Sequence, residues 1–577
     1  MAFSKVAFLM IILAFLIFSC TEESPKDFDN KIGFEISDAE QTATYHEMIS
    51  FYKAAAKHSD KVDITEMGET DSGLPLHLIT FNSRNTSENP LHVLINNGIH
   101  PGEPDGIDAS MLLLRDLING IHNLPENVVL HIIPAYNLGG MLNRNSTTRA
   151  NQNGPESYGF RGNAKNYDLN RDFIKMDTKN MAAFAEIYHQ IDPDVYVETH
   201  VSNGADYQYT LTHLITQHNK LGYDLGDFTE NTFRPELEKN IRDKELMITP
   251  YVNVFGRTPD SGFNQFFDSA RYSTGYTALW NTLGLMIETH MLKPYQQRVI
   301  QTKSMLESII DIAGKHQGQI QKFRAKNAKD FSHDEYYRFN YVLDSTAYEI
   351  LNFKGYTSAY IKSEVTELPR LKYYNDQPQS FPVKYFNQYK AKDSIKIPDY
   401  YIIPGAWDNV LKRLKLNAVE FLEIEKDTFI NVDTYYIEKY DTYTSAYEGH
   451  YPHYNTLAES KNNTLNFKKG DIIVPVRQKS MRYIIETLEP EMKDSFFNWN
   501  FFDSILQQKE GFSAYVFENY AKDFLEENPE IYKEFQLKRE TDDNFRTNAY
   551  QQLNWIYEKS PLYENSHLRY PVFRVFD

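Results

Sequence analysis

Residues 91–117, "LHVLINNGIHPGEPDGIDASMLLLRDL", decide the fold of this chain. The first five are a short apolar run with branched side chains, which predicts a buried strand. From Asp105 onward the apolar residues recur at helical spacing, which predicts a helix that begins near this residue. His100 and Glu103 therefore lie where a strand ends and a helix begins. Open α/β sheets place their ligand sites at such positions.

Strand and helix patterns alternate on both sides of this stretch. The alternation predicts an α/β fold with a mixed, largely parallel twisted sheet and helices on both of its faces. The predicted strands are residues 77–81, 92–97, 128–137, 194–200 and 283–290, and the predicted helices are residues 45–56, 107–118, 181–190 and 296–312.

The sequence becomes polar and charged around residues 316–335, which indicates a domain boundary. We therefore expect one domain over residues 38–320 and an α+β accessory domain over residues 335–577. In the second domain, strands are predicted at residues 400–404, 419–425, 434–440 and 471–476, and helices at residues 495–509 and 521–535.

The bulk composition excludes one class of partner. The chain of 577 residues has a net charge of -19, which argues against nucleic acid, because phosphate binding needs basic faces. Cys20 is the single cysteine, so no disulfide can form within the chain. We expect packing and a metal to hold the fold.

The N-terminus has the pattern of an export signal. Residues 6–18 are continuously apolar, too short to span a bilayer but suited to a signal-peptide core. The following "LIFSC" resembles a bacterial lipoprotein signal, which implies a signal peptide over residues 1–19, lipidation of Cys20 and a tether over residues 20–37. Thr21 after the cysteine implies the outer membrane of a Gram-negative cell envelope. An ordinary signal peptide and a short anchor helix are the alternatives.

His100 and Glu103 could supply two ligands to a metal. Zinc in a hydrolase takes three protein ligands and leaves one position open for water. His200, at the end of the predicted strand at 194–200, is a candidate for the third ligand. The His-x-x-Glu spacing alone is weak, because about one such pair arises by chance in an acidic chain with this many histidines. A structural role for His200 is the alternative.

Two further features carry polar chemistry. The segment "NAKNYDLNRDF" at residues 163–173 holds Asp168, Asn170 and Arg171, and an arginine fork can pair a carboxylate through two hydrogen bonds. Glu288 ends an apolar strand, where a charge is costly unless the strand opens into a site. A solvent-exposed loop and an ordinary salt bridge are the alternatives.

Together these residues resemble one family. Four features follow the order and approximate spacing of the zinc carboxypeptidases, metallopeptidase family M14. They are "HPGE" at residues 100–103, "DLNR" at residues 168–171, His200 at a strand end and Glu288 in "MIETH". The resemblance covers residues 45–312, about half of the chain. It implies that His100, Glu103 and His200 bind one zinc ion and that Glu288 activates the zinc-bound water as general base and acid.

The resemblance also implies where a substrate binds. Asn170 and Arg171 would hold the free C-terminal carboxylate of a peptide, and Arg161 would stabilise the oxyanion of the transition state. Tyr272 and Tyr276 are both candidates for the mobile tyrosine of the family. The residue that selects the C-terminal side chain would fall near Ser273.

These roles predict a zinc metallocarboxypeptidase that acts on peptides with a free C-terminus. A zinc-dependent deacylase or amidase acting on N-acyl amino acids or cell-wall peptides is the alternative, because a related branch shares the motifs. A surface-binding lipoprotein without catalysis is the alternative from another class.

The second half offers fewer signals. "YEGHYPHYN" contains Glu448, His450 and His453, which could form a second metal site or be surface side chains. A very aromatic stretch follows, and its phenylalanines are interpreted as core residues: Phe496, Phe497, Phe501 and Phe502. We expect this domain to pack on the first one.

Overall fold

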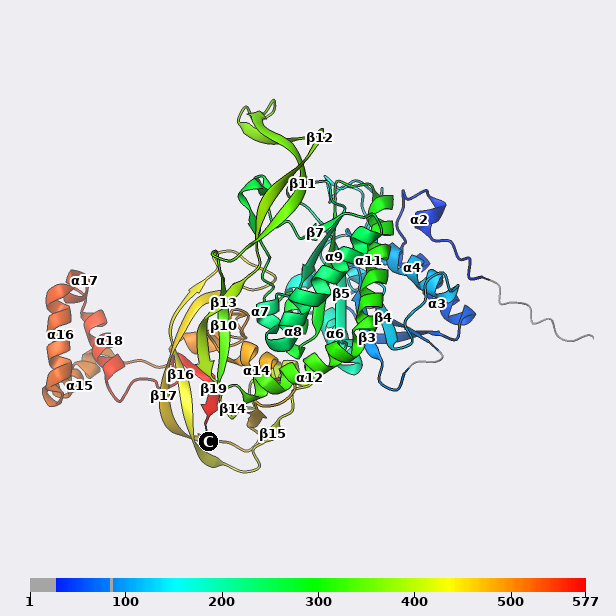
Figure 1. Ribbon diagram of the computed structural model, residues 1–577. Coiled ribbons are helices and arrows are strands. Elements are labelled where there is room, and N and C mark those ends of the chain that lie inside the picture. The colour runs from blue at the N-terminus through cyan, green and yellow to red at the C-terminus, as the bar shows by residue number, and fades with distance from the viewer. Residues whose placement is uncertain (1–26, 84–86, 577) are drawn as a thin grey trace, which may run out of the picture.

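The computed structural model describes residues 27–83 and 87–576 (Figure 1). The predicted signal peptide, Cys20 and the beginning of the tether lie outside these residues. Among the helices of the described part, none combines the length and the apolar character needed to cross a bilayer.

The first half is built on an eight-stranded sheet with the strand order β1-β2-β4-β3-β5-β9-β6-β7. Strands β4, β3, β5 and β9 are mutually parallel, whereas β1, β2 and β6 have antiparallel neighbours. The mixed sheet expected from the sequence is confirmed, although β1, β6 and β7 were not among the predicted strands. The bounds are β1 (Val62–Glu69), β2 (Pro75–Asn82), β3 (Leu91–Asn96), β4 (Val128–Ile133), β5 (Val195–Ser202), β6 (Leu211–Ile215), β7 (Ile248–Pro250) and β9 (Leu283–His290).

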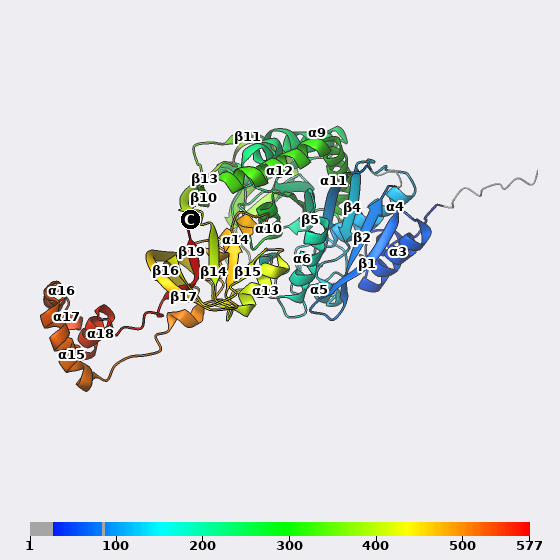
Figure 2. The same cartoon turned by 90° about the horizontal axis from the view of Figure 1, so that it is seen from below.

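Helices cover both faces of this sheet (Figures 1 and 2). Side chains of a strand alternate between faces, so Val93 and Ile95 of β3 pack on one side and Leu94 on the other. Burial on both faces explains why the central strands read as continuous apolar runs. One face is covered by α3 (Tyr45–His58), α4 (Asp105–Ile118) and α11 (Tyr295–Lys315), and the other by α6 (Lys179–Ile191).

Further short elements complete this half. They include α5 (Leu138–Leu142), the 3-10 turn η1 (Leu169–Arg171), α7 (His218–Leu221), α8 (Tyr223–Phe228), α9 (Arg234–Asp243) and α10 (Ser273–Thr277). The helix α12 (Gln317–His333) then occupies most of the polar segment that suggested a domain boundary.

The second half is centred on a six-stranded sheet with the order β15-β18-β14-β19-β16-β17. It packs against the α6 face of the first half, because one apolar cluster joins Phe184 of α6 to Tyr401 of β14 and Tyr483 of α14. The expectation that the second half packs on the first is thus met. The bounds are β14 (Tyr400–Ile403), β15 (Leu422–Glu423), β16 (Thr428–Thr442), β17 (His453–Phe467), β18 (Ile472–Pro475), β19 (Arg569–Val575), α13 (Asp408–Leu416) and α14 (Met481–Leu488).

Of the two helices predicted in the second half, the one at residues 495–509 is wrong and the one at residues 521–535 is divided between two helices. Residues 495–509 form turns and the 3-10 helix η5 (Asp503–Leu506), because Phe496, Phe497 and Phe502 are fully buried without a helical stripe. Residues 521–535 belong to two helices, α15 (Ala514–Glu527) and α16 (Pro529–Thr541). Pro529 explains the break, since proline disfavours the helical conformation of the residue before it.

Two parts project from the body of the molecule (Figure 1). One is the hairpin of β11 (Glu349–Lys362) and β12 (Pro369–Phe386), whose base pairs with β8 (Phe263–Asn264). The other is a helical module of α15, α16, α17 (Asp543–Arg546) and α18 (Ala549–Lys559) with its own small core. The strands β10 (Tyr336–Leu343) and β13 (Tyr389–Lys396) form a separate pair beside the body.

Candidate active site

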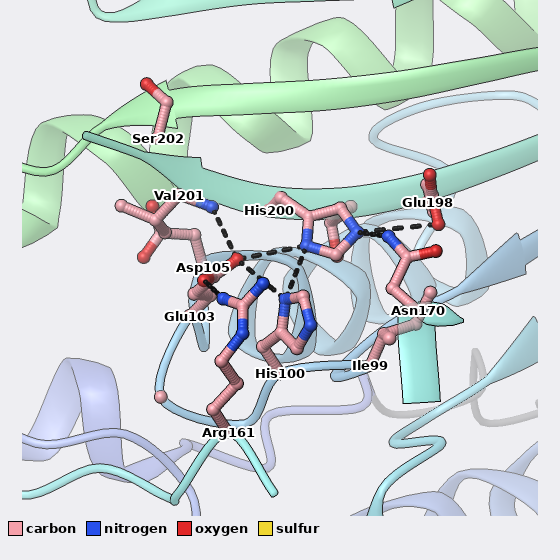
Figure 3. Close-up of polar contacts among 12 residues, drawn as sticks. Ile99, His100, Glu103, Asp105, Arg161, Asn170, Glu198, His200, Val201 and Ser202 are labelled. Carbon is pink, nitrogen blue, oxygen red and sulfur yellow. Dashed lines mark hydrogen bonds and ion pairs between the residues drawn. The ribbon is translucent and has the colours of Figure 1, made fainter. Parts of the chain in front are cut away.

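Three possible metal-ligand atoms converge at the carboxyl edge of the parallel strands (Figure 3). His100 and Glu103 lie in the loop between β3 and α4, and His200 lies on β5. The Nδ1 atoms of the two histidines are 3.1 Å apart, and Glu103 Oε2 is 3.4 Å from that of His100 and 3.0 Å from that of His200. The structure thus brings together the three residues predicted as metal ligands.

The spacing of these atoms suits a zinc ion. Ligand atoms at about 2.0–2.1 Å from a tetrahedral zinc are roughly 3.3 Å from one another. The observed separations of 3.0–3.4 Å are close to this value. Two imidazole nitrogens and one carboxylate oxygen also match the ligand types of catalytic zinc sites and leave one position open.

Each histidine is oriented by a carboxylate on its far nitrogen. His100 Nε2 lies 2.7 Å from Asp168 Oδ1, and His200 Nε2 lies 3.4 Å from Glu198 Oε2. Such partners fix the ring orientation and raise the basicity of a ligating histidine. No role was predicted for Asp168 from the sequence, and Glu198 was not among the predicted site residues. The signal for Glu198 was its position two residues before His200, which puts both side chains on one face of β5.

The Glu103 carboxylate is fully paired. Arg149 Nη1 donates to Glu103 Oε1 at 2.7 Å and Arg161 Nη1 at 3.2 Å, while the backbone N–H of Val201 donates to Oε2 at 3.0 Å. Although burial opposes ionisation, Arg149 and His100 hold the pKa of Glu103 well below its usual range. Glu103 is therefore an anion at neutral pH, as a metal ligand must be.

Glu288 lies beside the three ligand residues on β9. It is the register neighbour of His200 on β5, and both side chains line the same cavity. Among the described residues, Glu288 Oε2 has no hydrogen-bond partner. The pKa of Glu288 is raised to about 8, mainly by burial and also by the negative charges of Glu103 and Glu198, against the opposing charge of His200. A buried carboxylate with a free oxygen and a raised pKa is suited to transferring protons.

The candidate substrate-binding residues line the same cavity, whose volume is about 380 Å³. Arg171 stacks on the ring of Tyr272, with its guanidinium carbon 4.5 Å from the ring centroid. Asn170 is held by the backbone N–H of Ser273, which donates to its Oδ1 at 3.1 Å. Arg161 is partly exposed and is oriented by Asp168, which accepts from its Nε at 2.9 Å.

The two tyrosines predicted near the site have different positions. Tyr272 lines the cavity, but Tyr276 is fully buried in the core, where its hydroxyl donates to Asn417 Oδ1 at 2.6 Å. The structure therefore places Tyr276 away from the cavity. Ser273 is likewise buried beside Asn170 and does not line it.

Tyr251, which the sequence analysis missed, lines the cavity directly after β7. Burial, and then the nearby charge of Glu288, raise the pKa of its phenol, so the hydroxyl remains a hydrogen-bond donor at neutral pH. One tyrosine among 41 carries no distinguishing signal in the sequence, because only the fold brings it to the site.

One end of the cavity is apolar. Leu214 of β6 and Met286 of β9 are register partners, and their side chains line the cavity together with those of Phe255 and Phe266. Met286 shares a face of β9 with Glu288, because the two are separated by two positions. The cavity therefore extends from the carboxylate-rich centre to an apolar wall.

The polar residues of "YEGHYPHYN" do not form a metal cluster in the described part of the chain. Glu448 accepts a hydrogen bond from the backbone N–H of Asp168, His450 contacts Asp177, and His453 contacts Thr442 and Asp503. The interpretation of Phe496, Phe497 and Phe502 as core residues is confirmed, and Phe501 is partly buried against them.

Comparisons with known proteins agree with the geometry. Residues 48–213 match the family model described as zinc carboxypeptidase, peptidase M14. The chain is 21% identical over 434 residues to carboxypeptidase 2 of Trichophyton rubrum, which covers 71% of this chain and 74% of that protein. It is also 21% identical over 430 residues to carboxypeptidase 2 of Trichophyton tonsurans, with the same coverage of both chains.

Solved structures similar to this chain include two bacterial enzymes. A metallo-carboxypeptidase from Burkholderia cenocepacia has a TM-score of 0.36 at 17% identity, covering 46% of this chain and 68% of that one. A metallo-carboxypeptidase from Pseudomonas aeruginosa has a TM-score of 0.38 at 14% identity, covering 48% and 70%.

The family match includes His100, Glu103, Asn170, Arg171 and His200, all of which line the cavity that also holds Glu288. Residues 48–213 are therefore similar to the zinc carboxypeptidase family, and the chain is a hydrolase of the metallopeptidase class.

Proposed function

We propose that this protein removes C-terminal residues from peptides with one zinc ion held by His100, Glu103 and His200. The single observation that carries the proposal is the convergence of these three side chains beside Glu288, whose Oε2 has no partner among the described residues. When bound, zinc would polarise the scissile carbonyl and lower the pKa of a water molecule to about 7.

Glu288 is the proposed proton carrier. Its side chain lines the cavity and one of its oxygens has no partner among the described residues, so it can accept a proton from the attacking water and deliver it to the leaving nitrogen. The positive charge of a bound dication would lower the pKa of Glu288 from about 8, which makes the carboxylate available as a base near neutral pH.

Two arginines that line the cavity beside Asp168 would hold the substrate. Arg171 and Asn170 bind the terminal carboxylate of the peptide, and Arg161 stabilises the negative charge that develops on the carbonyl oxygen. Anchoring the terminal carboxylate allows only the last peptide bond to reach the metal, which makes the enzyme an exopeptidase. Tyr272 supports Arg171 by stacking, and Tyr251 is a further donor at the cavity.

The relatives named carboxypeptidase support this proposal over the deacylase or amidase alternative. The deciding experiment is mass spectrometry of a mixed peptide library incubated with the zinc-loaded protein, with the chelated protein and with Glu288→Gln. We expect ladders shortened from the C-terminus with the loaded protein alone. Cleavage of N-acyl amino acids or cell-wall peptides, with free-C-terminus peptides intact, would instead establish the alternative.

We also propose that the protein is lipid-anchored at Cys20 in the cell envelope, after removal of residues 1–19. The support is the "LIFSC" pattern after an apolar run, and Thr21 favours the outer membrane. Fractionation of cells that express the full chain should find it in the outer membrane. Cys20→Ser should release the protein from that fraction, and an unchanged distribution would contradict the lipid anchor.

A further inference from the structure

A turn from the second half of the chain reaches the loop that precedes η1. It connects β16 and β17, and Tyr447 and His450 close it with backbone hydrogen bonds of 2.8 and 3.1 Å. Glu448 and Gly449 between them have φ values of 49° and 79°, as in a two-residue type I′ turn. Glutamate is rarely found with positive φ, and such residues persist only where surrounding contacts hold them.

The turn makes close contact with Tyr167 and Asp168. Glu448 Oε2 accepts a hydrogen bond of 2.8 Å from the backbone N–H of Asp168, across 280 positions of the sequence. A Cβ atom on Gly449 would lie 2.6 Å from the hydroxyl oxygen of Tyr167. Glycine at position 449 therefore allows the turn to lie against Tyr167. In this position the Glu448 carboxylate reaches the backbone N–H of Asp168.

Asp168 is central to the candidate active site. Its carboxylate contacts His100 and Arg161, and it also accepts from the backbone N–H of Asn170 at 2.9 Å. Asn170 and Arg171 follow directly in η1. Fixing the backbone of Asp168 consequently fixes the start of the segment that carries the proposed carboxylate-binding residues.

A second contact holds the neighbouring loop. Asp494 of the second half is buried, accepts from Arg271 Nε at 2.7 Å and accepts from the backbone N–H of Arg271 at 3.1 Å. Arg271 also stacks on Trp499, with 4.8 Å from its guanidinium carbon to the ring centroid. Tyr272, which supports Arg171, is the next residue in the chain.

The two loops are also joined to each other. The backbone N–H of Phe173 donates to Arg271 O at 3.3 Å, and that of Ser273 donates to Asn170 Oδ1 at 3.1 Å. The loop with Asn170 and Arg171 and the loop with Tyr272 thus form one unit. Carboxylates from the second half hold this unit at both of its ends.

We propose that Glu448 and Asp494 are positioning residues for the substrate carboxylate, so that the second half is part of the catalytic unit. This inference rests on the proposed function, because it assigns to Asn170 and Arg171 the binding of a peptide C-terminus. Neither Glu448 nor Asp494 lines the cavity, and each acts through a backbone N–H beside a residue that does.

The test uses the zinc-loaded full chain and a short peptide in two forms, with a free and with an amidated C-terminus. Calorimetry measures binding of both peptides to Glu288→Gln, with and without Glu448→Ala, so the readout does not depend on turnover. We expect Glu448→Ala to weaken binding of the free-carboxylate peptide about tenfold and to leave binding of the amidated peptide within twofold. Glu448→Gln should restore most of the affinity, because its amide oxygen can still accept from Asp168. Asp494→Ala should act in the same direction as Glu448→Ala.

Glu491→Ala is the matched control. The Glu491 carboxylate also accepts a backbone N–H, that of Ala458 at 3.0 Å, but within the second half. If Glu448→Ala weakens binding of both peptides equally, or of neither more than Glu491→Ala does, the positioning role is wrong. A protein that distinguishes the two peptides as expected but cleaves neither in its wild-type form would contradict the proposed function and leave the positioning role standing.

Discussion

At the scale of single residues, the candidate site concentrates buried carboxylates around two histidines. Glu103, Asp168 and Glu198 each contact a histidine, and Glu103 and Asp168 also pair with arginines. A buried carboxylate is costly unless it is paired, so this set is stable only when histidines, arginines or a metal balance it. Among the described residues, Glu198 Oε1 and Glu288 Oε2 both lack a hydrogen-bond partner, and of these two residues Glu288 is the one that lines the cavity, which fits a residue that exchanges protons.

The raised pKa of Glu288 predicts a pH-dependent effect on stability. In the folded chelated protein the carboxyl keeps its proton up to a pKa of about 8, whereas the unfolded chain releases it near 4.5. The free energy of unfolding therefore falls as pH rises between these values. Glu288→Gln lacks this loss, so its melting temperature should exceed that of the chelated wild type by a margin that grows from pH 5 to pH 8. Thermal melts at several pH values check this, and a margin independent of pH would contradict it.

Asp168→Asn should weaken the metal site. The amide holds the His100 ring less firmly and removes a negative charge, and loss of such a partner typically costs about 10–100-fold in metal affinity. Competition with a chromophoric chelator measures the zinc affinity. Asp108→Asn is the control, since this buried carboxylate of α4 contacts Tyr295 and not the ligand histidines. Equal affinities of the two variants would contradict a role of Asp168 in orienting His100.

At the scale of elements, the helix α4 must approach β5 closely for His100 and Glu103 to meet His200. Gly106 makes this possible, because a Cβ there would lie 1.9 Å from Thr199 Oγ1 and 2.5 Å from Asn97 Oδ1. Thr199 directly precedes His200 on β5. Gly106, the last residue of "GEPDG", thus allows the close contact between α4 and β5 that brings the proposed metal ligands together.

Gly106→Ala should consequently destabilise the protein by about 1–3 kcal/mol, as overpacking of a core does. It should also lower zinc affinity, because α4 is pushed away from β5. Gly318→Ala is the matched control: this glycine lies in α12, nothing lies within 4 Å of its added Cβ, and alanine favours a helix. Melting temperatures of the two variants decide the matter, and equal values would show that α4 can shift without cost.

Element prediction succeeded where one periodicity dominated. The five strands predicted in the first half are present, because burial on both faces requires uninterrupted apolar runs. The helix expected at residues 495–509 failed because its aromatic residues are buried by contacts with distant parts of the chain, among them Tyr440 and Tyr570. The local sequence pattern indicates only a preference for helix, and contacts in the tertiary structure can override that preference.

At the scale of the whole molecule, the second half has parts with different roles. The six-stranded sheet shares a core with α6, whereas the helical module buries its apolar residues only within itself. The chain segments that enter and leave the helical module lie side by side, because Glu564 accepts hydrogen bonds from the backbone N–H groups of Lys509 and Glu510 at 2.6 and 2.8 Å. A short linker between these two segments can therefore replace the module.

Replacing residues 511–563 with a short Gly/Ser linker should leave the body folded. The melting temperature of the body should stay within a few degrees of its wild-type value, and kcat/KM on a peptide within about twofold, since additivity holds for distant sites. A chain ending at residue 334 is the contrasting variant: it exposes the cluster shared with α6 and should not fold stably. Loss of activity on removal of the module would assign it a catalytic contribution that its separate core does not indicate.

The sequence by itself determined five of the eight sheet strands of the first half, the residues proposed as metal ligands and the base, and the aromatic core of the second half. These features depend on local periodicity or on short motifs at strand ends, where the next residues along the chain carry the signal. Tertiary structure alone decided the places of Tyr251 and Tyr276, the pairing of Asp168 with His100, and the contact of Glu448 with Asp168. The physical reason is that side-chain contacts across tens to hundreds of residues depend on strand register, loop path and the docking of the two halves, none of which a local pattern encodes.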